Sequence, residues 1–89
     1  MRKISNVDVI VLFDQDGIHP IRFKLHENDE AVVIKVDYFK ILGRERHGEI
    51  AEFTWREDMV FDCKSRINGR DRRYRLKFSV KDFVWELWE

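Results

Sequence analysis

The dipeptide Asn68-Gly69 constrains the fold of this chain more than any other feature. It separates two runs, over residues 58–67 and 70–80, in which apolar and polar side chains alternate. Asn-Gly tolerates the positive φ angles of a two-residue type I′ turn, and alternation is typical of strands with one face against a core. Residues 58–80 are therefore predicted to form a β-hairpin.

The alternation gives this hairpin an apolar face and a basic face. The side chains predicted to point inward are Met59, Phe61, Cys63, Ser65, Ile67, Tyr74, Leu76, Phe78 and Val80. Those predicted to point outward are Lys64, Arg66, Arg73, Arg75 and Lys77. Like charges directly opposed on neighbouring strands destabilise a sheet by about 0.2–1 kcal/mol per pair. This ladder of cations indicates that an anionic surface lies nearby.

Further strands are predicted from similar patterns. Val7 to Phe13 is apolar on both alternating sets, which is typical of a central strand covered on both faces. Pro20 to Leu25 alternates strictly, and a turn at residues 26–30 follows it. Glu49 to Trp55 is either a short strand or a single helical turn, and Phe83 to Trp88 is predicted to be the last strand, with Phe83, Trp85 and Leu87 on one face.

Ala31 to Ile41 is predicted to be one continuous strand. Its buried face is expected to carry Val32, Ile34, Val36 and Tyr38. Val33 and Phe39 stand among charged residues on the opposite face, so part of that face is expected to be covered. Residues 42–48 are charged, bounded by glycines and without periodicity, which predicts a loop.

The fold class follows from these strands and from the absence of any ten-residue segment with helical periodicity. We predict an all-β fold, a small antiparallel meander of six or seven strands that is closed or nearly closed into a barrel. Residues 1–89 have room for a single domain.

Three stretches give the chain a resemblance to known proteins: Ile34 to Asp37, Cys63 to Gly69 and Tyr74 to Phe78. With the VDVIVLF strand, the acidic-Gly turn and the PIRFKL strand, they resemble a family of short bacterial proteins of Firmicutes type. The resemblance covers roughly residues 8–88 and is weaker between residues 43 and 57. That family has no assigned activity, so the resemblance implies a shared fold and no site residues.

One motif is similar to a catalytic motif. Asp14-x-Asp16-Gly17 follows an apolar strand and resembles the first motif of haloacid-dehalogenase-type phosphatases, in which the first Asp is the nucleophile and the second the general acid/base. That chemistry needs further acidic ligands for Mg²⁺ and a parallel α/β sheet, for which the chain has no helical pattern. A calcium loop would need Glu at its twelfth position, where the chain has Leu25. A plain Asp/Gly turn is the preferred interpretation.

The sequence has no clear motif for a metal site, a phosphate-binding loop or a cysteine nucleophile. The three histidines and Cys63 show no metal-ligand spacing, and no glycine-rich phosphate loop is present. Cys63 lies on the inward face, where a small core residue is more common than a nucleophile. We therefore predict a protein that is not an enzyme and that has no catalytic, metal or cofactor site.

The positive charge of the hairpin predicts a binding surface. Residues 64–81 carry eight basic side chains and one acidic side chain, although the whole chain is neutral. The candidate contacts with phosphates are Lys64, Arg66, Arg70, Arg72, Arg73, Arg75 and Lys77. No exposed aromatic side chain is expected on the same face to stack on bases. An ion-paired face, an acidic protein partner and nucleic acid therefore remain alternatives.

A protein partner or a second copy of the chain could instead contact outward apolar residues. The candidates are Val33 and Phe39, or Val84 and Trp88. Trp55 and Trp85 are expected inside the core. We predict a binding or protein-interaction module of unknown partner, with a nucleic-acid-binding small barrel as the alternative.

The chain offers no sign of a membrane location. Its longest apolar run, Val9 to Phe13, is far shorter than the roughly 18 residues of a membrane-spanning helix. Cys63 is the only cysteine, so an intrachain disulfide is impossible, which favours a cytoplasmic protein.

Overall fold

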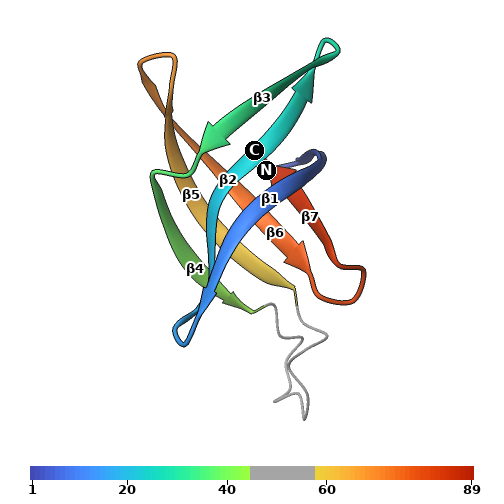
Figure 1. The fold of residues 1–89 in the computed structure, drawn as a ribbon, viewed down its shortest axis with the longest axis vertical. Helices are drawn as coiled ribbons and strands as arrows, with labels where there is room; N and C mark the ends of the chain where they lie inside the picture. Colours follow the sequence, from blue (N-terminus) through green and yellow to red (C-terminus); the bar gives the residue numbers. More distant parts are fainter. Residues whose placement is uncertain (45–57) are drawn as a thin grey trace.

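A computed structural model describes residues 1–44 and 58–89 of the chain, and Figure 1 shows its fold. The described residues form seven strands and no helix. The strands are β1 (Lys3–Asp14), β2 (Gly17–Glu27), β3 (Glu30–Lys35), β4 (Tyr38–Arg44), β5 (Met59–Ile67), β6 (Arg70–Ser79) and β7 (Val84–Trp88). The predicted all-β fold is confirmed. Among the described residues, none belongs to a helix long and apolar enough to cross a membrane.

The seven strands form one antiparallel sheet in the order β3-β2-β1-β7-β6-β5-β4. Each strand pairs with its neighbours in the chain, except that β3 does not pair with β4. The first and last strands pair instead, so β1 and β7 lie side by side in the middle of the sheet (Figure 1). The sheet curls into a half-barrel. This arrangement confirms the predicted barrel-like meander.

The segment predicted as one strand over residues 31–41 is two strands joined at a corner. At that corner the Val36 amide donates to the Ile21 carbonyl at 2.9 Å, and the Asp37 amide donates to the Lys64 carbonyl at 3.1 Å. The chain thus leaves the edge beside β2 at Val36 and reaches the edge beside β5 at Asp37. Val36 and Asp37 belong to neither β3 nor β4, so the predicted single strand is wrong.

The corner changes which side chains face inward. Ile34 and Val36 are buried as predicted, but Tyr38 is 58% exposed and Phe39 packs against the core. The predicted faces of these two residues are therefore wrong, because the bend at the corner shifts the alternation by one position. Val32 is also exposed, since β3 is an edge strand with a neighbour on one side only.

The core lies on the concave side of the curled sheet. Its buried apolar residues are Val7, Phe23, Ile34, Val36, Phe61, Cys63, Tyr74, Leu76, Phe78 and Leu87. Trp85 packs against two of them, with ring centroids 5.6 Å from Phe61 and 5.0 Å from Phe78. Its predicted inward position is confirmed. Trp55 lies outside the described residues.

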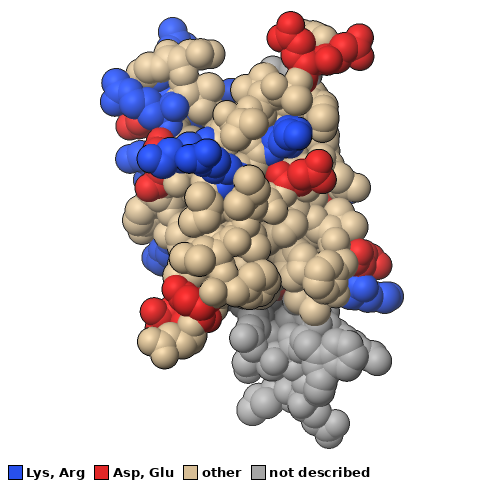
Figure 2. Space-filling model, in the orientation of Figure 1, with Lys and Arg blue, Asp and Glu red and all other residues tan. Residues whose placement is uncertain are grey.

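The convex side of β1 is exposed, contrary to the prediction of a strand covered on both faces. Val7 is buried, but Ile10 and Leu12 on the other face are 64% and 53% exposed, and Phe13 at the strand end is 68% exposed. The reason is that the described strands form a single curled layer, which has only one inside. In Figure 2, Lys and Arg gather near the end where the β5–β6 hairpin turns, and the middle of this side carries few charges.

The turns follow from local chemistry. Asn68 and Gly69 have φ angles of 53° and 78°, which confirms the predicted two-residue turn. Asn28 and Asp29, with φ angles of 49° and 63°, form a second two-residue turn where a longer one was expected. Phe83 has φ 57° in the turn before β7 and is 81% exposed, so its predicted place on the inward face is wrong.

Two remaining predictions concern the connection between β4 and β5. The loop predicted at residues 42–48 begins too early, because β4 continues to Arg44. The short strand or helical turn predicted at residues 49–55 lies outside the described residues.

Candidate functional site

The convex side of β4, β5, β6 and β7 carries the basic residues of the hairpin, and we call it the outer face. Its side chains alternate along each strand with the buried core residues. They include Tyr38 and Lys40 on β4, Val60, Asp62, Lys64 and Arg66 on β5, Arg73, Arg75 and Lys77 on β6, and Val84, Glu86 and Trp88 on β7. Lys3 of β1 lies beside Trp88 at its border.

Aromatic side chains stand on two sides of the central arginines. In the register of the sheet, Trp88 is directly opposite Arg75 on β6. Lys64 is opposite Arg73 on one side and opposite Tyr38 on the other. The expectation that the basic face lacks exposed rings is therefore wrong. The sequence pattern contained the outward position of Trp88, but only the pairing of β7 with β6 brings it beside the basic residues.

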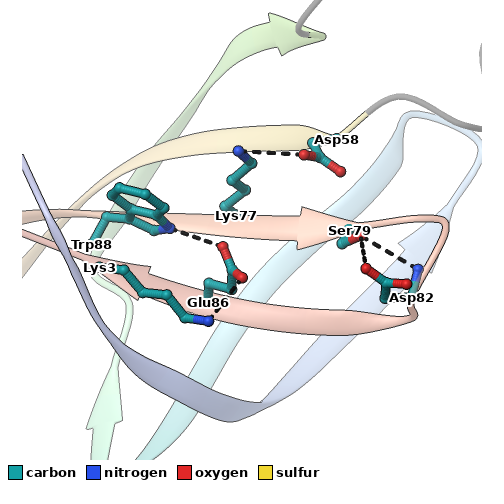
Figure 3. A network of polar contacts seen from close by, with 7 residues as sticks. All are labelled: Lys3, Asp58, Lys77, Ser79, Asp82, Glu86 and Trp88. Carbon is teal, nitrogen blue, oxygen red and sulfur yellow. Dashed lines mark hydrogen bonds and ion pairs between the residues drawn. The ribbon is translucent and has the colours of Figure 1, made fainter.

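The indole of Trp88 is held in place by polar contacts (Figure 3). Its Nε1 donates to Glu86 Oε1 at 3.1 Å, and Glu86 Oε2 lies 3.1 Å from Lys3 Nζ. Lys77 Nζ lies 5.6 Å from the centroid of the indole, within the range of a cation–π contact. The ring is thus fixed among three cations, Arg75 included.

Glu86 stays ionised in this arrangement. Burial by itself raises the pKa of its carboxyl, but the hydrogen bonds from Lys3 and Trp88 and the charges of Lys3 and Lys77 outweigh burial. The net result is a pKa below the ordinary value. A charged Glu86 can keep both Lys3 and the indole oriented at neutral pH.

The basic ladder is less uniform than predicted. On the outer face, Lys64 and Arg73 are the directly opposed pair of cations between β5 and β6, whereas Arg75 is opposite Asp62 and Lys77 is opposite Val60. On its other side, Lys77 is opposite Glu86. The cost of like-charge repulsion is therefore small, because carboxylates interrupt the ladder.

Part of the positive charge is paired within the chain. The ion pairs are Lys64 with Asp71 at 3.9 Å, Arg72 with Glu89 at 2.7 Å, and Lys77 with Asp58 at 3.3 Å. The first two pairs are exposed, and such pairs contribute about 0–1 kcal/mol each and are screened by salt. The ion-paired interpretation thus applies to some of the basic residues.

The structure separates the seven predicted contact residues into two groups. Arg70 and Arg72 have the parity of the inward-facing Tyr74, so they lie on the other side of the hairpin, near its turn. Arg66, Arg73 and Arg75 lie on the outer face, exposed, and none of them forms an ion pair with a described residue. These three guanidinium groups are available to a ligand, and Arg73 and Arg75 are the ones that lie nearest the two aromatic rings in the sheet register.

Two shallow hollows lie on the outer face. One, of about 220 Å³, is lined by Met1, Val60, Arg75, Lys77 and Trp88. The other, of about 290 Å³, is lined by Tyr38, Asp62, Cys63, Lys64 and Arg73. Each hollow combines one aromatic ring with two cationic side chains. This combination suits a flat, aromatic and anionic ligand.

The two pairs of residues predicted as alternative protein contacts lie in different parts of the sheet. Val33 is exposed on β3, whereas Phe39 packs against the core, with its ring centroid 6.1 Å from that of Phe61. Val84 and Trp88 are partly buried on β7, which β1 and β2 separate from β3. Val33 and Phe39 thus face different ways, whereas Val84 and Trp88 lie on the same face of β7.

The remaining candidate residues lie in the turn after β1 and in the core. Asp14 accepts a hydrogen bond from the Asp16 amide at 2.8 Å and lies 2.9 Å from His19 Nε2, and these contacts lower the pKa of its carboxyl. The Asp/Gly motif thus forms a turn. Cys63 is buried, and burial raises the pKa of its thiol to about 12, which keeps it protonated. Within residues 1–44 and 58–89, no three His, Cys, Asp or Glu side chains are grouped to hold a metal ion.

A comparison of the chain with protein-family models, with curated proteins and with solved structures finds no match. The family resemblance of the strand and hairpin motifs stays a prediction.

Proposed function

We propose that the chain is a non-enzymatic binding protein whose outer face binds an extended anionic polymer, and that single-stranded nucleic acid is the ligand class. The observation that carries this proposal is the position of Tyr38 and Trp88 on either side of Arg73 and Arg75. Arginines neutralise phosphates, and exposed rings stack on bases whatever their sequence.

The spacing of the two rings favours a single strand. Trp88 on β7 and Tyr38 on β4 are three inter-strand steps apart and offset by two residues along the strands, which places them about 16 Å apart. Stacked bases lie about 3.4 Å apart along one strand, so the two rings would receive different bases of the same chain. Arg73 and Arg75, between them, would meet the connecting phosphates. In a duplex the bases are paired and stacked inside, where neither ring could reach a base face.

The net charge of the chain also predicts how tightly it binds a polyanion. The chain has no net charge at pH 7, so it would attract a polyanion only at short range. We therefore expect binding in the micromolar range that weakens steeply with salt.

The test is a titration of fluorescently labelled single-stranded and double-stranded oligonucleotides, followed by anisotropy at two salt concentrations. We expect salt-sensitive binding that is stronger for single strands. Arg75→Ala should weaken binding and lower the slope of log K against log salt by about 0.7, the value for one phosphate contact on a single strand.

Two further variants separate stacking from charge. Tyr38→Ala should weaken single-strand binding by about 1–3 kcal/mol, and Tyr38→Phe should restore it, because stacking needs only the ring. Arg22→Ala is the matched control, since Arg22 is exposed on β2, away from the outer face. Absence of salt-sensitive binding at micromolar protein, or equal loss in Arg22→Ala and Arg75→Ala, would contradict the proposal. Equal binding of an acidic polypeptide would point to a protein partner instead.

A further inference from the structure

We infer that the hollow beside Tyr38 is a base-selective subsite that prefers guanine, an inference that rests on the proposed function. The feature that distinguishes this hollow is the carboxylate of Asp62 in its lining. The hollow beside Trp88 has two cations and no carboxylate in its lining. The two hollows therefore differ in chemistry although both contain a ring.

The position of Asp62 on the outer face is not explained by sequence-independent binding of phosphates. Its neighbours across the sheet are Arg75 on β6 and Lys40 on β4, yet it forms no ion pair with any described residue. An unpaired carboxylate repels phosphates, so it weakens a surface that binds them without regard to sequence. Its acceptor oxygens can instead receive hydrogen bonds from the donor groups of a base.

Guanine is the base whose edge matches this arrangement. Its Watson–Crick edge presents two adjacent donors, N1–H and the N2 amino group, to the two oxygens of a carboxylate. Adenine and cytosine present one amino donor beside an acceptor nitrogen, which the second oxygen would repel. Thymine and uracil present one N–H between two carbonyl oxygens.

The cations of the hollow complete the match. Guanine also carries two acceptors, O6 and N7, to which Lys and Arg side chains commonly donate. Lys64 and Arg73 line the same hollow as Asp62, and the Tyr38 ring can stack on the base. A base at this position would meet a hydrogen-bond acceptor, two cationic donors and an aromatic ring. Guanine has a group that matches each of them.

The experiment compares short single strands of thymidine in which one central position is dG, dA or deoxyinosine. Deoxyinosine is deoxyguanosine without the N2 amino group, so it removes one of the two donors. We expect wild-type protein to bind the dG strand about tenfold more tightly than the deoxyinosine and dA strands. Asp62→Asn should abolish this difference and should bind the plain thymidine strand more tightly, because a negative charge is removed.

Asp71→Asn is the matched control. Asp71 is an exposed carboxylate of the same hairpin, paired with Lys64, and it does not line the hollow. This variant should keep the preference for dG. If wild-type protein binds all strands equally, or if Asp62→Asn keeps the preference, the subsite does not exist and the proposed function stands. If no strand binds at all, the proposed function fails and the subsite with it.

Discussion

Ser65 and Tyr74 place two hydroxyl groups inside an otherwise apolar core, each 1% exposed. The Ser65 hydroxyl donates to the Lys35 carbonyl at 2.6 Å, which leaves the Tyr74 hydroxyl, 2.5 Å away, to donate to Ser65 Oγ. Burial raises the pKa of Tyr74, so its hydroxyl remains a donor at neutral pH. These bonds join β6 and β5 to the corner where β3 ends, and both hydroxyl groups have partners.

Removing one hydroxyl of this pair should destabilise the protein more than its own bond suggests. Ser65→Ala or Tyr74→Phe leaves a buried partner without a hydrogen bond, which costs about 1–3 kcal/mol. The double variant should cost less than the sum of the two single variants, because the Tyr74 hydroxyl is no longer left without an acceptor. Urea denaturation of the four proteins measures this difference. Strictly additive losses would show that the two hydroxyl groups act independently.

At the scale of the element, the β5–β6 hairpin is the part of the fold that local sequence predicts best. Asn68-Gly69 forms the expected turn, and the buried residues Phe61, Tyr74 and Leu76 lie on the expected face. The reason is that a two-residue turn sets the register of both strands, and alternation then assigns every side chain to a face.

Two glycines in turns should respond differently to substitution by alanine. A Cβ added at Gly69 or Gly17 would meet no atom within 4 Å, so only the backbone matters. Gly69 has φ 78°, near the left-handed well that alanine reaches at a cost of about 1–2 kcal/mol. Gly17 has φ 121°, farther from that well. We therefore expect Gly17→Ala to lower the free energy of unfolding more than Gly69→Ala, and the reverse order in thermal or urea denaturation would contradict this explanation.

At the scale of the whole molecule, the first and last strands hold the sheet together at its middle. The Arg2 amide donates to the Glu89 carbonyl at 2.7 Å, and the Glu89 amide donates to the Arg2 carbonyl at 3.0 Å. Lys3 and Glu86 add an ion pair across the same two strands. Because β7 also pairs with β6, these contacts join the β1–β2–β3 part of the sheet to the part that carries the outer face.

The Glu86 contacts should make stability depend on pH in the acid range. The pKa of this carboxyl is lowered in the folded state, so its contribution to stability is present above its ordinary value of 4.5 and is lost as pH falls below it. The group is partly exposed, so we expect a contribution below about 1 kcal/mol. Urea denaturation between pH 3 and 6 should show a steeper loss for wild-type protein than for Glu86→Gln. Parallel curves would contradict the assignment.

The candidate site shows where prediction from sequence stops. The outward positions of Lys64, Arg73 and Arg75 follow from the alternation within the hairpin. The approach of Trp88 and Tyr38 to these cations does not, because it depends on which strands β6 and β5 pair with on their outer sides. The position of Tyr38 also depends on the corner at Val36 and Asp37. The sequence alternates through this corner without a break, so the pattern does not indicate it.

The sequence by itself determined the all-β class, the turn at Asn68-Gly69 and the basic side of one hairpin, because these depend on residues close together in the chain. Only the tertiary structure decided that the sheet is a single curled layer, that β1 and β7 meet in its middle and that two aromatic rings flank the arginines. Those features depend on pairing between distant segments, and the free energy of that pairing comes from burying the whole concave face at once. The hairpin thus carries the basic residues, and the pairing of the other strands places the aromatic rings beside them.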